Sequence, residues 1–223
     1  MYNLRKVPYK ETTAWKMSLV KVKFCGITRE EDLRKAVELG VDYVGFIMYP
    51  KSPRWVGWEK LKHFLSLSEG VKKVVVFVNP SYQEVEQALS MGADFVQLHG
   101  EESFEFAKAI GLDKVIKALR VKDSIFVDDV WKKAHAILLD TYSEKAYGGT
   151  GESFDWKIAK SVVDAGFRVF LSGGLNPENV SYAIRLVKPY AVDVSSGIES
   201  SPGIKDQRKM EAFIHAVKNA LKD

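Results

Sequence analysis

The chain contains a single cysteine, which ends a short apolar run, Lys-Phe-Cys25-Gly-Ile-Thr. Alternate residues of an extended strand face opposite sides, so Lys21, Lys23 and Cys25 share one face, with Val22 and Phe24 on the other. A thiolate can serve as a base when a neighbouring ammonium lowers its pKa. We therefore expect Cys25 to accept a proton, with Lys23 bringing its pKa toward about 7. The alternative is a small, unreactive core residue.

A second polar residue at the end of an apolar run is Asp140, in Ile-Leu-Leu-Asp140-Thr. An Asp in this place is as often only a turn or cap residue. The Gly-rich segment that follows, Tyr147-Gly-Gly-Thr-Gly151, is suited to closing over a ligand, although it lacks the lysine and spacing of a P-loop. Together these features make Asp140 a candidate site residue.

Two small-residue segments follow consecutive apolar runs near the C-terminus: Ser-Gly173-Gly174-Leu-Asn-Pro and Asp-Val-Ser195-Ser196-Gly197. Free backbone N–H groups of small residues at a helix N-terminus are a common phosphate-binding arrangement. Either segment alone could be a plain turn. The pair of them on neighbouring strands of a barrel predicts a phosphate site.

Three further polar residues lie at the ends of apolar runs. Arg54 lies on a loop stiffened by Pro50 and Pro53 and suits a carboxylate clamp. His99, in Gln97-Leu-His99-Gly, is on its own more typical of a hydrogen-bonded structural residue. Asp193 is predicted to point inward and therefore needs a cationic partner, for which Lys23 is the candidate.

These residues are carried by a repeating pattern of apolar run, turn and amphipathic run. The predicted strands are Lys21–Cys25, Asp42–Ile47, Lys73–Val78, Asp94–Leu98, Lys114–Ala118, Ala136–Leu139, Arg168–Leu171 and Tyr190–Val194. The predicted helices are Arg29–Leu39, Trp58–Leu67, Tyr82–Ser90, Ser103–Ile110, Trp156–Ala165, Pro177–Val187 and Asp206–Leu221, with a weaker one over Lys122–Lys133. Thr28 and Glu31 predict a capping box before the first helix.

Eight strand-then-helix units without a linker predict a single domain, a (β/α)8 barrel over residues 21–223. The alternative is an open doubly wound sheet, which the count of eight and the lack of an early GxGxxG disfavour. In a barrel, the chemistry lies at the carboxyl ends of the strands, where the candidate residues fall. Residues 1–20 show no clean period and are predicted to be a short N-terminal extension, with Met17 as a second candidate start.

Composition narrows the class of function. The net charge is +4 and the pI about 8.9, a mild surplus that suits the handling of small anions but is too diffuse for nucleic acid. One cysteine excludes a disulfide framework and a Cys-rich zinc site. No apolar run approaches the ~20 residues of a membrane span, and the first twenty residues are not a signal peptide. We expect a cytoplasmic protein.

From about Val20 to the C-terminus, the sequence resembles the phosphoribosylanthranilate isomerase family of tryptophan biosynthesis. The resemblance rests on ordered motifs: Lys-Phe-Cys25-Gly-Ile-Thr, Gly45-Phe, Ser-Pro-Arg54, Val78-Asn, Gln97-Leu-His99-Gly, Leu-Leu-Asp140-Thr, Gly-Gly-Thr-Gly-Glu-Ser-Phe-Asp155-Trp156, Leu-Ser-Gly-Gly-Leu-Asn-Pro-Glu-Asn-Val180 and Val-Asp193-Val-Ser-Ser-Gly-Ile-Glu199. It implies a (β/α)8 barrel and an Amadori rearrangement of an aminoaldose phosphate to a ketose, an intramolecular oxidation–reduction without metal or organic cofactor.

The resemblance also implies residue roles. Asp140 matches the general acid that opens the sugar ring, and Cys25 matches the general base that removes the C2 proton. Arg54 matches a contact to the anthranilate carboxylate. The Gly173–Gly174 and Ser195–Gly197 segments match the phosphate cradle, and His99 and Asp193 are groups on the substrate side. The implied partner is a phosphorylated small molecule, with the chain a monomer or a homodimer.

Three rival interpretations remain. The related histidine-pathway aldose–ketose isomerase uses carboxylates as both acid and base and cradles phosphate in both halves, whereas here Cys25 holds the first strand and the early strand ends lack a Gly pair. A ligand-binding barrel without catalysis would be favoured by loss of Cys25 or Asp140, and both are present. A nucleic-acid module would need a clustered basic face with aromatics.

Overall fold

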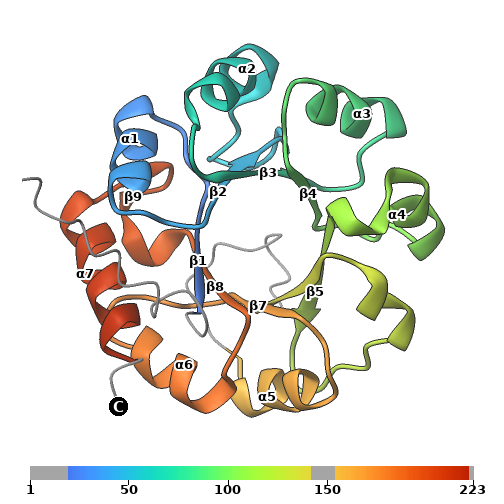
Figure 1. Cartoon of the computed structure of the whole chain (residues 1–223), viewed down its shortest axis with the longest axis vertical. Helices are drawn as coiled ribbons and strands as arrows, with labels where there is room; N and C mark the ends of the chain where they lie inside the picture. The colour runs from blue at the N-terminus through green and yellow to red at the C-terminus, as the bar shows by residue number, and fades with distance from the viewer. Residues whose placement is uncertain (1–19, 142–153, 221–223) are drawn as a thin grey trace, which may run out of the picture.

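The computed structural model describes residues 20–141 and 154–220, and within them eight parallel strands close into a barrel in chain order. The last strand pairs with the first, with Lys23 in register with Asp193. Figure 1 shows the helices as a ring outside the strands. The predicted (β/α)8 barrel is confirmed. The open doubly wound sheet is wrong, because the first and last strands are hydrogen-bonded to each other.

All eight predicted strands are present, with boundaries shifted by a few residues at most. They are β1 Lys21–Cys25, β2 Tyr43–Ile47, β3 Lys72–Phe77, β4 Phe95–Leu98, β5 Val115–Val121, β6 Ala136–Thr141, β7 Val169–Leu171 and β8 Ala191–Val194. Acidic residues mark two of the starts: the Asp42 carboxylate accepts a hydrogen bond from the Val22 amide, and the Asp94 carboxylate accepts one from the Lys73 amide, both at 2.9 Å. These side-chain hydrogen bonds extend the pairing of neighbouring strands by one residue at their amino ends.

The seven clear helical patterns are also confirmed. The helices are α1 Glu30–Glu38, α2 Gly57–Leu67, α3 Tyr82–Ser90, α4 Phe104–Ile110, α5 Trp156–Asp164, α6 Val180–Val187 and α7 Gln207–Asn219. Short 3-10 turns cover η2 Leu112–Lys114, η3 Asp129–Lys133 and η4 Ser196–Ile198, and a small antiparallel hairpin, β9 Glu199–Ser201 and β10 Ile204–Lys205, follows the barrel. The sequence did not predict this hairpin.

Two local predictions are wrong. The segment Lys122–Lys133 forms no α-helix: β5 runs on to Val121, and only the 3-10 turn η3 follows, capped by the Asp128 side chain. Thr28 and Glu31 form no capping box, because Arg29 precedes α1 without a side-chain cap. The Thr28 hydroxyl donates instead to the Gly203 carbonyl, which lies on the β9–β10 hairpin. A tertiary contact has replaced the local one.

The core has two layers separated by the barrel wall. Outward-facing strand residues pack under the helices, as Phe24 does edge-on against Phe213 of α7 with ring centroids 6.0 Å apart. Inward-facing residues form a second cluster, which includes Val74, Ile116 and Leu138. The predicted alternation on β1 is confirmed, since Phe24 belongs to the outer layer and Cys25 to the inner one.

An aromatic cluster lies at the amino ends of the strands. Phe95 and His135 lie with ring centroids 4.0 Å apart, and the Tyr43 hydroxyl is 3.4 Å from His135 Nε2 and 3.2 Å from the Tyr190 hydroxyl. Phe170 packs edge-on against Tyr43, with ring centroids 5.2 Å apart. We call these five residues the basal cluster. They lie at the opposite ends of the strands from the candidate residues.

Two features are absent from the described residues. In residues 20–141 and 154–220, no helix is long and apolar enough to cross a bilayer. The same part of the chain holds no group of three or more His, Cys, Asp or Glu side chains placed to bind a metal ion. The predicted extension lies outside the described residues apart from Val20, as do the Tyr147–Gly151 segment and Leu221.

Candidate active site

The inward positions at the carboxyl ends of the strands open into a pocket with about 540 Å³ of open space. Six of the predicted site residues line it: Cys25, Arg54, His99, Asp140, Asp193 and Ser195. The structure therefore brings together side chains from four strand ends, β1, β4, β6 and β8, and one loop. Sequence reasoning did not assign a role to the other lining residues, which are Ile47, Tyr49, Ser52, Val76, Val78, Gln97 and Ser172.

Cys25 ends β1 with a buried side chain in this pocket. Its neighbour in register on β2 is Gly45, where an added Cβ would lie only 2.8 Å from the Cys25 Sγ. Glycine at that position leaves room for the thiol. Burial raises the pKa of the Cys25 thiol above its ordinary value, because it disfavours the thiolate more than the ammonium of Lys23 favours it.

The predicted pair of Lys23 and Asp193 is confirmed. Lys23 Nζ donates to Asp193 Oδ1 at 2.7 Å, with both side chains buried, and the Ser172 hydroxyl donates to Asp193 Oδ2 at 3.1 Å. Lys23 lowers the pKa of the Cys25 thiol as expected, and pairing with Asp193 offsets part of that effect. The expectation that the pKa reaches about 7 is nevertheless wrong, because burial raises it by more than Lys23 lowers it.

Asp140 lies on β6 with its two oxygens in different environments. Oδ1 accepts a hydrogen bond from the Thr141 amide at 2.8 Å, while Oδ2 lies 3.5 Å from His99 Nε2. Gln97 Nε2 lies 3.0 Å from His99 Nδ1, and when the amide donates there the ring proton is assigned to Nε2, facing Asp140. Gln97, which sequence reasoning missed, thus orients the imidazole.

Two polar atoms of this group remain unsatisfied. Gln97 Oε1 and His99 Nε2 are buried and have no hydrogen-bond partner among the described residues. Buried polar atoms are rarely left this way without a ligand, water or functional reason. Both side chains line the pocket. The arrangement therefore offers a polar group to a bound molecule beside Asp140.

Arg54 enters the pocket already paired with a carboxylate of the protein. Its Nε and Nη2 donate to the two oxygens of Glu199 at 2.9 and 2.7 Å, a bidentate pair that is buried. Sequence reasoning quoted Glu199 only as part of a motif. Burial by itself would raise the pKa of Glu199, but Arg54 and Lys205 hold it below its ordinary value. The predicted contact of Arg54 to a substrate carboxylate stays a prediction.

The two Gly/Ser segments approach each other closely. An alanine Cβ at Gly197 would overlap the Leu175 carbonyl oxygen, and one at Gly173 would overlap the Thr141 hydroxyl. Gly173 also has a φ of +82°, in the left-handed region that favours glycine. Helix α6 begins at Val180, three residues later than predicted, after a turn in which the Asn176 carboxamide oxygen accepts from the Glu178 and Asn179 amides.

Four of the predicted phosphate residues follow the ends of β7 and β8 but do not line the pocket: Gly173, Gly174, Ser196 and Gly197. Their neighbour Ser195 does line it. The predicted phosphate segments therefore follow adjacent strands, as predicted, and Ser195 is the residue through which they reach the pocket. Their contact with a phosphate group stays a prediction.

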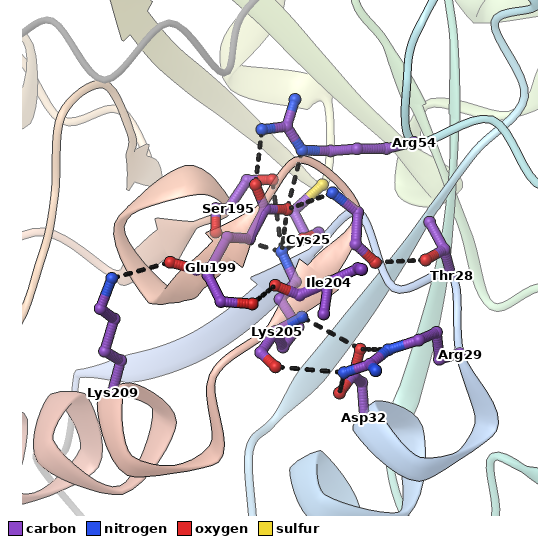
Figure 2. A network of polar contacts seen from close by, with 12 residues as sticks. Cys25, Thr28, Arg29, Asp32, Arg54, Ser195, Glu199, Ile204, Lys205 and Lys209 are labelled. Carbon is purple, nitrogen blue, oxygen red and sulfur yellow. Dashed lines mark hydrogen bonds and ion pairs between the residues drawn. The ribbon is translucent and has the colours of Figure 1, made fainter.

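Beneath Cys25 and Ser195, a buried lysine joins the rim of the barrel to the β9–β10 hairpin. Lys205 Nζ donates to the Cys25 carbonyl at 2.6 Å, to the Ser195 carbonyl at 3.1 Å and to Glu199 Oε1 at 2.9 Å. Figure 2 shows Lys205 at the centre of this network, with Arg54 on the far side of Glu199. Lys205 carried no signal in the sequence, because it follows the last barrel strand and lies outside the repeating pattern.

The chain matches one family model, N-(5'-phosphoribosyl)anthranilate (PRA) isomerase, over residues 22–216. The chain belongs to the phosphoribosylanthranilate isomerase family. The chain is 53% identical over 203 residues to an N-(5'-phosphoribosyl)anthranilate isomerase of Aquifex aeolicus. The aligned region covers 90% of this chain and all of that protein. The match covers nearly the whole barrel, so the family assignment rests on the entire fold.

Solved structures of phosphoribosylanthranilate isomerases share this architecture. The crystal structure of the enzyme from Thermotoga maritima has a TM-score of 0.80 and 39% identity, covering 90% of this chain and all of that one. Another phosphoribosylanthranilate isomerase structure, with a TM-score of 0.77, 38% identity and the same coverage, holds reduced 1-(o-carboxyphenylamino)-1-deoxyribulose 5-phosphate. The family resemblance and the barrel predicted from the sequence are both confirmed.

Proposed function

We propose that this chain isomerises N-(5'-phosphoribosyl)anthranilate to 1-(2-carboxyphenylamino)-1-deoxyribulose 5-phosphate, the family's step in tryptophan biosynthesis, with Asp140 as acid and Cys25 as base. The observation that carries the assignment of roles is that both side chains line one pocket at the carboxyl end of the barrel. An aldose–ketose rearrangement needs one group to give a proton and one to take a proton at neighbouring substrate atoms.

In the first step, Asp140 gives a proton to the ring oxygen of the furanose. The bond between that oxygen and C1 breaks, the oxygen becomes a hydroxyl, and the anthranilate nitrogen forms a Schiff base with C1. Asp140 suits this step because Oδ1 is held by the Thr141 amide, while Oδ2 lies beside the assigned N–H of His99. The His99 ring therefore faces the oxygen that exchanges the proton.

In the second step, Cys25 takes the proton from C2. The electron pair of that C–H bond moves into a C1–C2 double bond, and the π pair of the protonated C1–N Schiff base moves onto the nitrogen, which gives an enaminol. The enaminol then gains a proton at C1 and loses one from the C2 hydroxyl, which yields the ketose. Atoms balance over the two steps, since each proton given is recovered, and only side chains of this chain carry protons.

The remaining residues bind the ends of the substrate. The Gly173–Gly174 and Ser195–Gly197 segments hold the phosphate through backbone N–H groups, as adjacent loops after the last two strands of a barrel commonly do. Arg54 contacts the anthranilate carboxylate with the guanidinium group that Glu199 orients. Asp193 is held by Lys23 and Ser172 and presents a carboxylate to the sugar.

The proposal also covers the extent of the domain, the partner, the cellular location and the oligomeric state. The barrel domain comprises residues 21–223, and residues 1–20 are an extension that does not belong to this domain. The partner is a phosphorylated small molecule, and the enzyme is cytoplasmic and acts as a monomer or homodimer. Sedimentation of the full chain distinguishes the two oligomeric states.

The test is turnover of freshly made phosphoribosylanthranilate by the purified chain. We expect the aminoaldose to be consumed and the ketose formed, with a kcat/KM at least about a hundredfold above that for the histidine-pathway aldose. No turnover would favour a ligand-binding barrel. Comparable turnover of both aldoses would favour an enzyme that acts on both pathways.

A further inference from the structure

Lys205 is a buried cation next to the proposed base that the two-step mechanism does not use. Its side chain is 0% exposed, and its ammonium donates to the carbonyls of Cys25 and Ser195 and to the Glu199 carboxylate. These three acceptors engage three N–H donors, and only the charged form of a lysine has three. Lys205 is therefore an ammonium in contact with the backbone of the residue that is proposed to take the C2 proton.

The backbone of Lys205 is fixed as firmly as its side chain. Its amide donates to Asp32 Oδ2 at 3.1 Å, and its carbonyl accepts from Arg29 Nη2 at 3.2 Å. Asp32 is buried in α1 and also accepts from two nitrogens of Arg29, at 2.9 and 2.8 Å. Figure 2 shows this second group of contacts below Lys205. The ammonium is thus held at a set position between the ends of β1 and β8.

The charges around the Cys25 thiol do not cancel. Lys23 and Asp193 form a buried pair with no net charge. On the other side, Arg54 and Lys205 share the single carboxylate of Glu199, which leaves one positive charge uncompensated. Asp140, the proposed proton donor, and His99 line the same pocket. The uncompensated charge therefore comes from the side of Lys205 and Arg54.

We propose that Lys205 is a positioning residue for the base: it holds the Cys25 and Ser195 carbonyls at the rim of the barrel and contributes the unpaired positive charge that stabilises the Cys25 thiolate. The inference rests on the proposed role of Cys25 as base. It adds a second cation to Lys23, whose effect on the thiol Asp193 offsets in part. Lys205 lowers the pKa of Cys25 by less than Lys23 does, and both act against the larger effect of burial.

The test is the pH dependence of iodoacetamide alkylation of the sole cysteine, followed by mass spectrometry in the intact chain. In Lys205→Met, the alkylation midpoint should rise by up to roughly one pH unit, because a unit positive charge that contacts the Cys25 backbone is removed. In Glu199→Gln, which removes the compensating negative charge, the midpoint should fall. Structural loosening alone would not move the two midpoints in opposite directions.

The matched control is Lys209→Met, which removes an exposed ammonium that donates to the Glu199 carbonyl at 2.8 Å. Its midpoint should stay at the wild-type value. Equal midpoints in the wild type and Lys205→Met would overturn the proposal. If Lys205→Met does not fold, Glu199→Gln decides alone: a lower midpoint supports the proposal, and an unchanged or higher one overturns it.

The turnover rate of the Lys205 variants is a second test of the proposal. Lys205→Met should lower kcat at neutral pH at least about tenfold, and Lys205→Arg should restore part of it by keeping the charge. The alkylation midpoint needs no substrate. A chain that failed to isomerise phosphoribosylanthranilate would therefore contradict the proposed function and leave the effect of Lys205 on the thiol measurable.

Discussion

Cys25 shows how far residue types and strand alternation define this site. Alternation placed Cys25, Lys23 and Asp193 inside the barrel, and the structure confirms that Lys23 and Asp193 pair there. Gln97 and Ser172 also line the pocket, although neither was predicted as a site residue. The sequence held a signal for both: Gln97 lies two residues before His99, on the same strand face, and Ser172 directly precedes Gly173. Glu199 and Lys205 gave no such signal, because they lie beyond the last barrel strand. Their positions follow from the hairpin, which only the folded chain reveals.

At the residue scale, Gly197 is a sharp test of the phosphate segment. In Gly197→Ala, the Cβ would overlap the Leu175 carbonyl, so the loop after β7 or the one after β8 must move. We expect KM for phosphoribosylanthranilate to rise at least about tenfold and the free energy of unfolding to fall by about 1–3 kcal/mol. Steady-state kinetics and urea unfolding measure the two effects.

Gly166→Ala is the control for this prediction. Gly166 has a φ of +90° with nothing within 4 Å of an added Cβ, and it lies at the end of α5. Its substitution should cost stability through backbone strain while leaving KM unchanged. An unchanged KM in Gly197→Ala would mean that the segment does not hold the phosphate.

Among the elements, the periodicity of apolar residues predicted helices and strands correctly wherever one apolar face packs in the barrel. The strands and the seven helices follow from it, with α3 matching the predicted Tyr82–Ser90. Periodicity misled at Lys122–Lys133, where β5 continues to Val121 and only the 3-10 turn η3 forms in the segment that follows. The Thr28 capping box failed for a different reason. Gly203, distant in the sequence, competes for the hydroxyl, and a local motif contains no information about a distant partner.

The basal cluster makes an element-scale prediction about acid stability. Burial lowers the pKa of His135 from 6.5 to about 4. Between these values the unfolded chain binds a proton that the folded chain does not, so the free energy of unfolding falls as pH drops from 6.5 toward 4. Allowing for partial solvent screening, we expect His135 to account for about 1–2 kcal/mol of this loss.

Urea unfolding at pH 7 and pH 4.5 measures that contribution. His135→Gln should lose about 1 kcal/mol less stability between the two pH values than the wild type does. His215→Gln replaces an exposed histidine of α7 and should behave as the wild type. Equal losses in the wild type and in His135→Gln would show that the ring is protonated in the folded chain.

On the scale of the whole molecule, the barrel closes between Lys21 and Val194, and the last helix ends at Asn219. We therefore expect a chain that starts at Met17 to melt within a few degrees of the full chain and to keep its kcat and KM. Calorimetry and turnover check this. An insoluble or inactive truncated chain would show that residues 1–16 contribute to the fold or to the site.

The central claim is that separate side chains give and take the protons, and one set of kinetic and binding measurements tests it. Asp140→Asn and Cys25→Ser should each lower kcat about a thousandfold, the scale of one acid or base. Both should bind reduced 1-(o-carboxyphenylamino)-1-deoxyribulose 5-phosphate with a Kd within about threefold of wild type, because neither is proposed to hold the phosphate. Asp140→Asn with a tenth or more of wild-type turnover would contradict the assignment of the acid, and the same result in Cys25→Ser would contradict that of the base.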